Sequence, residues 1–178
     1  MPYTNEIECS HSTTVPYEDE MVIAGKGWRI GQYFTGVGAT SGYCSIVFKT
    51  PAGKKTLYKS ASIGKTGGEA KIELIESPTI GAGGTILTPY QLNRNRLELV
   101  CGLSDIRAGA NTAMTVINGT ATPADILPGE NQGSQRTPAT ATSAFMYLAP
   151  NTYYALKVTN LGSTTSNINI LMTLAVDV

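Results

Sequence analysis

The chain has 178 residues, of which 42% are hydrophobic and only 15% are charged, and its thirteen basic residues are balanced by thirteen acidic ones. This length suits one domain with a sizeable core. Zero net charge argues against a general electrostatic grip on nucleic acid or on an anionic membrane, because such binding needs an excess of Lys and Arg. A charge-poor surface rich in Thr and Gly instead favours a component of an oligomer or of a larger assembly.

The first 20 residues differ from the rest of the chain. They hold Pro2, Pro16 and the acidic run Glu18-Asp19-Glu20, without sustained alternation. We interpret residues 1–20 as an extended N-terminal arm that orders against a partner, or alternatively as a frayed terminus. They have neither the basic n-region nor the apolar h-region of a signal peptide, and no apolar run approaches the roughly 20 residues of a membrane span. We therefore expect a soluble product of the cytoplasm.

Residues 21–178 form the predicted domain, and most of it alternates between apolar and polar residues, the period of a half-buried strand. The apolar sets, in chain order, are Trp28, Ile30 and Phe34; Cys44, Ile46 and Phe48; Ala70, Ile72 and Leu74; Leu97, Leu99 and Cys101; Met114 and Val116; and Ile168, Ile170, Met172, Leu174 and Val176. Residues 143–149 and 152–160 are two further strands. No segment shows a 3.6-residue apolar repeat, and Gly, Pro and Asn clusters separate the strands. The pattern predicts an all-β, single antiparallel β-sandwich of jelly-roll-like type.

Gly64-Lys65-Thr66 has the final residues of a phosphate-binding P-loop. That motif needs a second glycine five positions earlier, where Lys59 stands, and a helix after the threonine, where Gly67-Gly68 and a strand follow. We interpret the segment as a hairpin turn.

Catalytic and metal sites are not expected. His11 is the only histidine, and a nucleophilic serine or cysteine would need it as a positioned base. The three cysteines, Cys9, Cys44 and Cys101, include no close pair, so we expect free thiols in a reducing compartment, with Cys44 and Cys101 as small core residues. So few scattered Cys and His residues do not make a zinc site. We predict no cofactor.

Acidic residues offer a glycosidase as a remote alternative, because such enzymes use paired carboxylates. Glu73, Glu76 and Glu98 lie on alternating segments where outward-facing charges are expected anyway, so we predict that the protein is not an enzyme. Asn118-Gly119 is interpreted as a turn rather than a glycosylation acceptor. Residues 119–142, with three prolines and little apolar content, predict a long loop, a class that is usually functional or mobile.

Asn93, Arg94, Asn95 and Arg96 alternate strictly between two apolar runs. In an extended segment the two arginines lie on one side and the two asparagines on the other. An arginine fork bonds a carboxylate or two carbonyls, and asparagine bonds its own backbone in turns. A nucleic-acid contact would need other basic residues nearby, but Glu98 follows. The segment predicts a braced sheet corner or a subunit boundary.

Several short motifs follow one another in a characteristic order: Thr50-Pro51, Glu76, Pro78-Thr79, Gly84-Thr85, Pro89, Asn93 to Arg96, and Thr159-Asn160 before a final strand. In this order they resemble a family of virion proteins of tailed bacteriophages. The resemblance spans roughly residues 17–178, and its specific part is the 69–96 segment. The chain departs from the family pattern after Arg96, where Leu97-Glu98 replace the usual Asn-Ser.

The resemblance implies a β-sandwich on the outside of the phage head, often a trimer. The expected function is that of a capsid decoration (cement) protein, made in the bacterial host cytoplasm, that binds the major capsid protein on the virion surface and stabilises the shell. Candidate subunit or capsid contacts are Tyr3, Ile7 and His11 in the arm, together with Asn93 to Arg96. The alternative is a receptor- or glycan-binding module of a head or tail fibre, which would use the tyrosines and the 119–142 loop.

Overall fold

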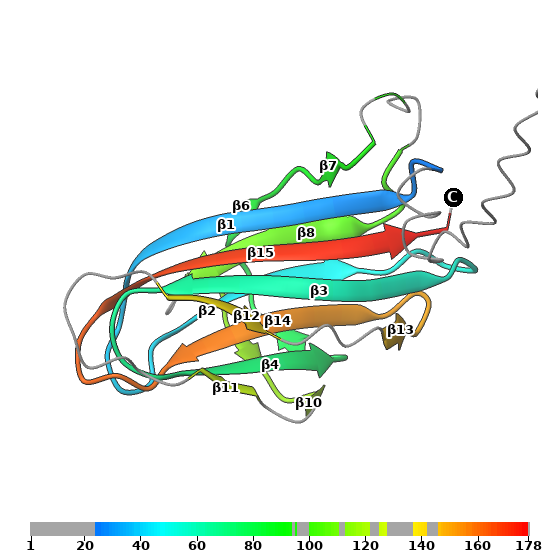
Figure 1. Ribbon diagram of the computed structural model, residues 1–178. Coiled ribbons are helices and arrows are strands. Elements are labelled where there is room, and N and C mark those ends of the chain that lie inside the picture. The colour runs from blue at the N-terminus through cyan, green and yellow to red at the C-terminus, as the bar shows by residue number, and fades with distance from the viewer. Residues whose placement is uncertain are drawn as a thin grey trace, which may run out of the picture.

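The computed structural model describes residues 24–93, 95, 100–110, 113–121, 125–127, 137–141 and 146–177, and only the backbone of 125–127 and 137–141. These residues contain no α-helix and form fifteen strands, most of which run along one long axis (Figure 1). The predicted arm, residues 1–20, lies outside the described residues.

Two antiparallel sheets carry the fold. Sheet A has the order β12 (Thr137–Ala141), β3 (Thr56–Lys65), β15 (Ser166–Val176), β1 (Gly27–Val37) and β7 (Tyr90–Gln91), and β13 (Met146–Leu148) also pairs with β3. Sheet B has the order β10 (Thr120–Ala121), β4 (Ala70–Glu76), β14 (Tyr153–Asn160), β2 (Tyr43–Lys49), β8 (Ser104–Ala110) and β6 (Thr85–Ile86), and β11 (Asp125–Leu127) also pairs with β4. A small third sheet joins β5 (Thr79–Ile80) to β9 (Val116–Ile117).

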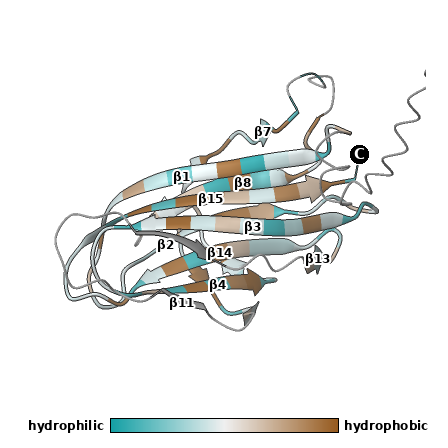
Figure 2. Cartoon of the chain, in the orientation of Figure 1, coloured by the Kyte–Doolittle hydropathy of each residue, from teal (hydrophilic) through white to brown (hydrophobic). Residues whose placement is uncertain are grey.

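The two large sheets pack face to face over one main core, which confirms the all-β antiparallel sandwich; the jelly-roll subtype stays a prediction. Hydrophobic and hydrophilic residues alternate along β1 and β15 (Figure 2). The main core contains the inward sets predicted for β1, β2, β4 and β15, namely Trp28, Ile30, Phe34, Cys44, Ile46, Phe48, Ala70, Ile72, Leu74, Ile168, Ile170, Met172, Leu174 and Val176. Period two therefore identified the buried face of these strands.

Sheet B has a second, smaller core on its outer face, which the alternation did not predict. It consists of Val47, Ile75, Met114, Val116 and Ala155, all buried. The chain segment that contains β9 folds over this face, so β2 is buried on both sides instead of half-buried. The hydroxyl of Tyr43 ties the covering segment down.

The hydroxyl of Tyr43 donates to the carbonyl of Met114 and accepts from the amide of Val116, both at 3.3 Å. These two bonds hold the covering segment on the outer face of sheet B.

Strand β3 was missed because its alternation is interrupted. Its register with β15 shifts between Thr173 and Leu174, leaving Lys59 as an extra residue. As a result Leu57 and Tyr58, adjacent in sequence, are both buried but belong to different clusters. A bulge of this kind reverses the inward face halfway along a strand and hides its period.

Strand β8 was missed for a similar reason. Its register with β2 shifts between Val47 and Lys49, beside Asp105, which has a φ of 47°. The strand predicted at Leu97, Leu99 and Cys101 is wrong at its described end: residues 100–103 are not in a strand, and β8 begins only at Ser104. Leu97 and Leu99 lie outside the described residues.

Two turn predictions can be compared with the backbone. Asn118 and Gly119 have φ values of 57° and 88°, as an Asn-Gly turn requires. Gly67 and Gly68 also have positive φ, but the turn they make joins β3 to β4 in the other sheet, so it is not a hairpin. The predicted 119–142 loop contains β10 and β11, which pair with β4, and β12, which pairs with β3.

The start of β14 is held by Thr50, which is buried. Its hydroxyl donates to the carbonyl of Ala149 at 2.7 Å and accepts from the amide of Thr152 at 2.9 Å. The backbone amide of Thr50 also donates to the Thr152 carbonyl at 3.0 Å. This side chain therefore joins the end of β2 to the turn that leads into β14.

The end of β14 is held by Asn160, which is fully buried. Its amide nitrogen lies 3.3, 3.0 and 2.8 Å from the carbonyl oxygens of Val37, Gly38 and Thr164. Its amide oxygen accepts from the backbone of Gly162 at 3.0 Å. One side chain thus joins the loop after β1 to the loop before β15, at the end of the sandwich where these turns gather (Figure 1).

Candidate interaction surface

One short segment closes one side of the sandwich by crossing from sheet B to sheet A. In β6, Thr85 and Ile86 pair with Ala108 and Arg107 of β8. In β7, Tyr90 and Gln91 pair with residues of β1, which belongs to the other sheet. Figure 1 shows β7 at the margin of the molecule. The segment therefore forms an edge of both sheets.

Backbone and side-chain hydrogen bonds anchor the segment at each end. The amide of Leu87 donates to the Ile106 carbonyl, and the amide of Leu92 donates to the Gly27 carbonyl, both at 2.9 Å. The side chain of Gln91 donates to the carbonyl of Gly25 at 2.8 Å. These hydrogen bonds fix the backbone of the segment, and the side chains that face outward remain free to contact another molecule.

Two large apolar side chains of this segment are exposed, Ile86 at 81% and Tyr90 at 70%, and so is Val100, in the chain before β8, at 81%. Ile86 and Val100 border a groove of about 610 Å³ between this segment and β8. The groove floor includes Trp28, Leu87, Pro89, Leu103 and Ile106. We call Ile86, Tyr90, Val100 and this groove the β6–β7 surface. Exposed apolar side chains gathered at a groove are typical of protein interaction sites.

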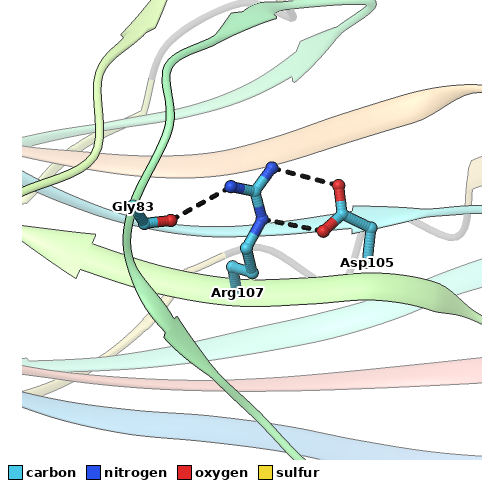
Figure 3. A network of polar contacts seen from close by, with 3 residues as sticks. All are labelled: Gly83, Asp105 and Arg107. Atoms are coloured by element: carbon cyan, nitrogen blue, oxygen red, sulfur yellow. Dashed lines mark hydrogen bonds and ion pairs between the residues drawn. The ribbon is translucent and has the colours of Figure 1, made fainter.

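Arg107 holds the neighbouring segment against β8 (Figure 3). Its Nε lies 2.7 Å from Oδ1 of Asp105, and its Nη2 donates to Oδ2 at 3.0 Å. Its Nη1 donates to the carbonyl of Gly83 at 3.0 Å. A guanidinium that bonds a carboxylate in two places is fixed in orientation, so the third donor places the Gly83 backbone accurately.

The backbone conformation and the close packing at positions 83 and 84 both require glycine. The φ values of Gly83 and Gly84 are 101° and 86°, which other residues rarely adopt. A Cβ at Gly83 would lie 2.3 Å from the Ala113 carbonyl oxygen, and one at Gly84 would lie 3.0 Å from that of Ala108. The close approach of this backbone to β8 explains the Gly84-Thr85 pair of the sequence pattern.

The predicted contact segment begins directly after β7. Asn93 is half-buried and Asn95 is exposed. The amide of Asn95 donates to Oδ1 of Asn93 at 3.0 Å, the local turn bond expected of asparagine. Of the other predicted contact residues, Arg94, Arg96, Tyr3, Ile7 and His11 lie outside the described residues. The structure therefore places the two asparagines beside the β6–β7 surface and leaves the arginines a prediction.

The structure describes two thiols, of which Cys44 is buried and Cys101 is half-buried. Cys44 is fully buried, and burial raises the pKa of its thiol far above the ordinary value. Burial also raises the pKa of Cys101 to about 11, although a hydrogen bond from the backbone of Leu103 lowers it in part. Both thiols therefore stay protonated at neutral pH, in line with the expected role of small core residues.

Alkaline pH is expected to destabilise the protein through Cys44. The unfolded chain loses this proton near pH 9 but the folded chain retains it, so stability is full below that pH and falls as the pH rises above it. The expected slope is about 1.4 kcal/mol per pH unit per such thiol. Urea unfolding between pH 8 and about 10.5, a range that crosses the ordinary thiol pKa, measures it. Cys44→Ala should flatten the slope, and parallel curves for the two proteins would contradict the assignment.

Within the described residues, no group of three or more His, Cys, Asp or Glu side chains lies close enough to hold a metal ion. No helix there is long and apolar enough to cross a membrane. Glu73 forms an ion pair with Lys71 at 2.7 Å on the outer face of β4, and Glu76 is exposed at the end of that strand. Glu98, the third carboxylate considered, lies outside the described residues.

Comparisons of the chain with protein-family models, with curated proteins and with solved structures give no match.

The β6–β7 surface was not anticipated from the sequence. Its strands have only two residues each, too short for alternation to be recognised. One signal was present: Pro89, just before β7, has no amide proton, and proline beside or within a strand is typical of a sheet edge. An edge together with three exposed apolar residues would have predicted an interface. The exposure of those residues, however, is known only from the folded structure.

Proposed function

We propose that the chain is a structural protein of a tailed-bacteriophage virion, and that it decorates the outer surface of the head. It acts as a small symmetric homo-oligomer, a trimer, that binds major capsid protein subunits. The β6–β7 surface and the adjacent Asn93–Arg96 segment make the subunit or capsid contacts.

The observation that carries this proposal is the exposure of Ile86, Tyr90 and Val100 beside that segment. Three large apolar residues on one side of a charge-poor protein favour association, since their burial removes apolar surface from water. Protein interfaces typically combine such an apolar centre with arginine and a polar rim. The Asn-Arg-Asn-Arg segment supplies residues of the second kind.

The family resemblance supports the same function. Three of its motif positions have structural duties here: Thr50 and Asn160 hold the two ends of β14, and Gly84 permits close packing on β8. Residues that a β-sandwich needs for its structure are expected to recur in related β-sandwiches. Of the motif residues at 93–96 that the structure describes, Asn93 is half-buried and Asn95 is exposed, which favours a role in contacts.

Decoration stabilises a capsid by mass action. A protein that binds only the assembled shell lowers the free energy of that state by the free energy of binding, multiplied over many sites. No catalytic step is needed, and a rigid β-sandwich with one binding surface is sufficient.

The test uses phage heads that lack the protein, to which purified variants are added. Ile86→Asp should weaken head binding at least about tenfold, because it puts a charge at the apolar centre of the contact. Tyr147→Ala is the control, since Tyr147 is 62% exposed and lies in β13, which pairs with β3 on the side of sheet A opposite to β7. Circular dichroism should show both variants folded.

Unchanged head binding by Ile86→Asp would contradict the proposed contact surface. Electron microscopy of the virion tests the location: a regular array over the head supports decoration, whereas a few copies at the tail would overturn it in favour of a fibre module.

A further inference from the structure

The outer face of sheet A carries a second hollow, separate from the β6–β7 surface. It measures about 660 Å³, and the described residues that line it are Tyr33, Ser62, Gly64, Lys65, Thr66, Asn167 and Asn169. This volume lies within the roughly 300–1,000 Å³ typical of small-molecule sites. The lining residues come from β1, β3 and β15 or directly follow β3.

Strand register explains how the hollow arises. Tyr33 of β1 is opposite Asn169 of β15, Asn169 is opposite Gly64 of β3, and Gly64 is opposite Pro138 of β12. One row across four strands thus contains an aromatic ring, an amide and a position without a side chain. The missing side chain at Gly64 leaves the depression.

Neither the backbone nor packing requires glycine at position 64. Its φ is not among the positive values found at other glycines of the chain. Among the described residues, a Cβ placed there would meet only the Cβ of Asn169, at 3.8 Å, an ordinary contact. Glycine in a strand interior is normally unfavourable. Its effect here is to keep the hollow open.

Among the described residues of the lining, Lys65 is the one charged side chain, and it is already engaged. Lys65 is buried, and its ammonium donates to the carbonyl of Gly67 instead of pointing to an anion. No carboxylate is among the described residues of the lining. Such a surface suits a neutral polar ligand better than a phosphate, a nucleic acid or a metal ion.

Hydrogen-bonding groups are available in the hollow. Asn169 and Ser62 are exposed, and neither side chain has a hydrogen-bond partner among the described residues. An amide and a hydroxyl each donate and accept, which matches the hydroxyl groups of a sugar. Asn167 is held in place, since its Oδ1 accepts from the amide of Gly36 at 3.1 Å.

Tyr33 supplies the remaining element of such a site. The residue is 49% exposed, so one part is packed and another faces the solvent. An aromatic ring pairs an apolar face with a polar tip. The apolar face of a pyranose ring, which carries C–H groups, can stack on it while the sugar hydroxyls reach the neighbouring amide.

We propose that this hollow is a saccharide-binding site, in which a neutral pyranose stacks on Tyr33 and its hydroxyls bond to Asn169 and Ser62. This activity goes beyond capsid decoration, and it does not depend on the β6–β7 surface.

The test uses the purified full-length protein without capsids, so that its outcome is independent of the decoration proposal. Maltohexaose, chitotetraose, a mannan-derived tetrasaccharide and, as an anion, inorganic phosphate are titrated to about 10 mM, a range that detects weak binding. The side-chain amide resonance of Asn169 in nuclear magnetic resonance spectra reports on the site. We expect at least one of the three saccharides to shift it saturably, and phosphate not to.

Two variants test the geometry. Gly64→Val fills the hollow from a strand position that accepts a side chain, and Tyr33→Ala removes the ring; each should weaken saccharide binding at least about tenfold. Tyr147→Ala, another exposed tyrosine, should bind as the unmodified protein does. The proposal is overturned if no saccharide shifts the Asn169 resonance, if phosphate does so instead, or if Gly64→Val binds with unchanged affinity. Thermal unfolding verifies that both variants are folded.

Discussion

Replacing Asn160 with alanine is expected to lower the free energy of unfolding by about 3–5 kcal/mol, a large share of the stability of a domain this size. The side chain is fully buried and bonds four backbone groups, from Val37, Gly38, Gly162 and Thr164. Alanine would remove these bonds and leave the carbonyls and the amide without partners. An unsatisfied buried polar group costs about 1–3 kcal/mol, whereas a lost exposed bond costs much less.

Urea unfolding followed by the fluorescence of Trp28, the single tryptophan, measures this loss, because Trp28 is buried. Asn167→Ala is the matched control: it removes one bond to Gly36 from a partly exposed asparagine and should cost less than about 1 kcal/mol. Asn160→Asp should be no milder than alanine, since it buries a charge and retains only the bond from Gly162. Equal losses for Asn160→Ala and Asn167→Ala would show that Asn160 does not hold the loops together.

Ile170→Asp is expected to abolish cooperative folding, with a loss of more than about 4–5 kcal/mol. Ile170 is fully buried in β15, opposite Gln32 of β1 and Ile63 of β3. Because β15 lies between these strands, a charge there disturbs the pairing of sheet A on both sides.

Asn169→Asp is the control for this change, since Asn169 is the preceding residue of the strand and faces the solvent. It should alter stability by no more than about 0.5 kcal/mol. Far-ultraviolet circular dichroism and urea unfolding measure both variants. A folded Ile170→Asp protein with a midpoint near that of Asn169→Asp would mean that the inward face of β15 has been assigned incorrectly.

The strands that the sequence predicted well are those with uninterrupted alternation. In β15 every second residue from Ile168 to Val176 is buried, as the pattern indicated, and near the end of the strand Thr173 and Ala175 are buried as well. The strands that it missed, β3 and β8, contain register shifts at Lys59 and beside Asp105. A bulge changes which face of the strand is inward, so a search for strict period two fails there although the strand is long and well paired.

The second core of sheet B could not be predicted from alternation either. Val47 belongs to the outward set of β2, and its burial depends on Met114 and Val116, which lie far along the chain. A pattern within one strand shows which residues are apolar. It does not show whether a distant segment will cover the opposite face.

The candidate sites also divide into one that local sequence indicated and two that only the tertiary structure revealed. The Asn93–Arg96 segment was recognised because its composition is unusual, and the Asn93 turn bond agrees with what asparagine does locally. The β6–β7 surface and the hollow beside Tyr33 were not recognised. Both consist of common residues, and each exists only because register and edge position bring those residues together.

By itself the sequence determined an all-β antiparallel sandwich, the inward faces of its regular strands and the turns at its glycines and asparagines. These are local properties, set by period two and by backbone preferences over a few residues. Only the tertiary structure decided that β14 and β15 lie inside the two sheets, that Thr50 and Asn160 hold the ends of β14, and that the 85–92 segment closes one side. Those outcomes depend on contacts between residues about a hundred positions apart, such as Asn160 with Val37. Such pairings follow from the balance of the whole fold, because any strand edge offers the same backbone hydrogen bonds to any other.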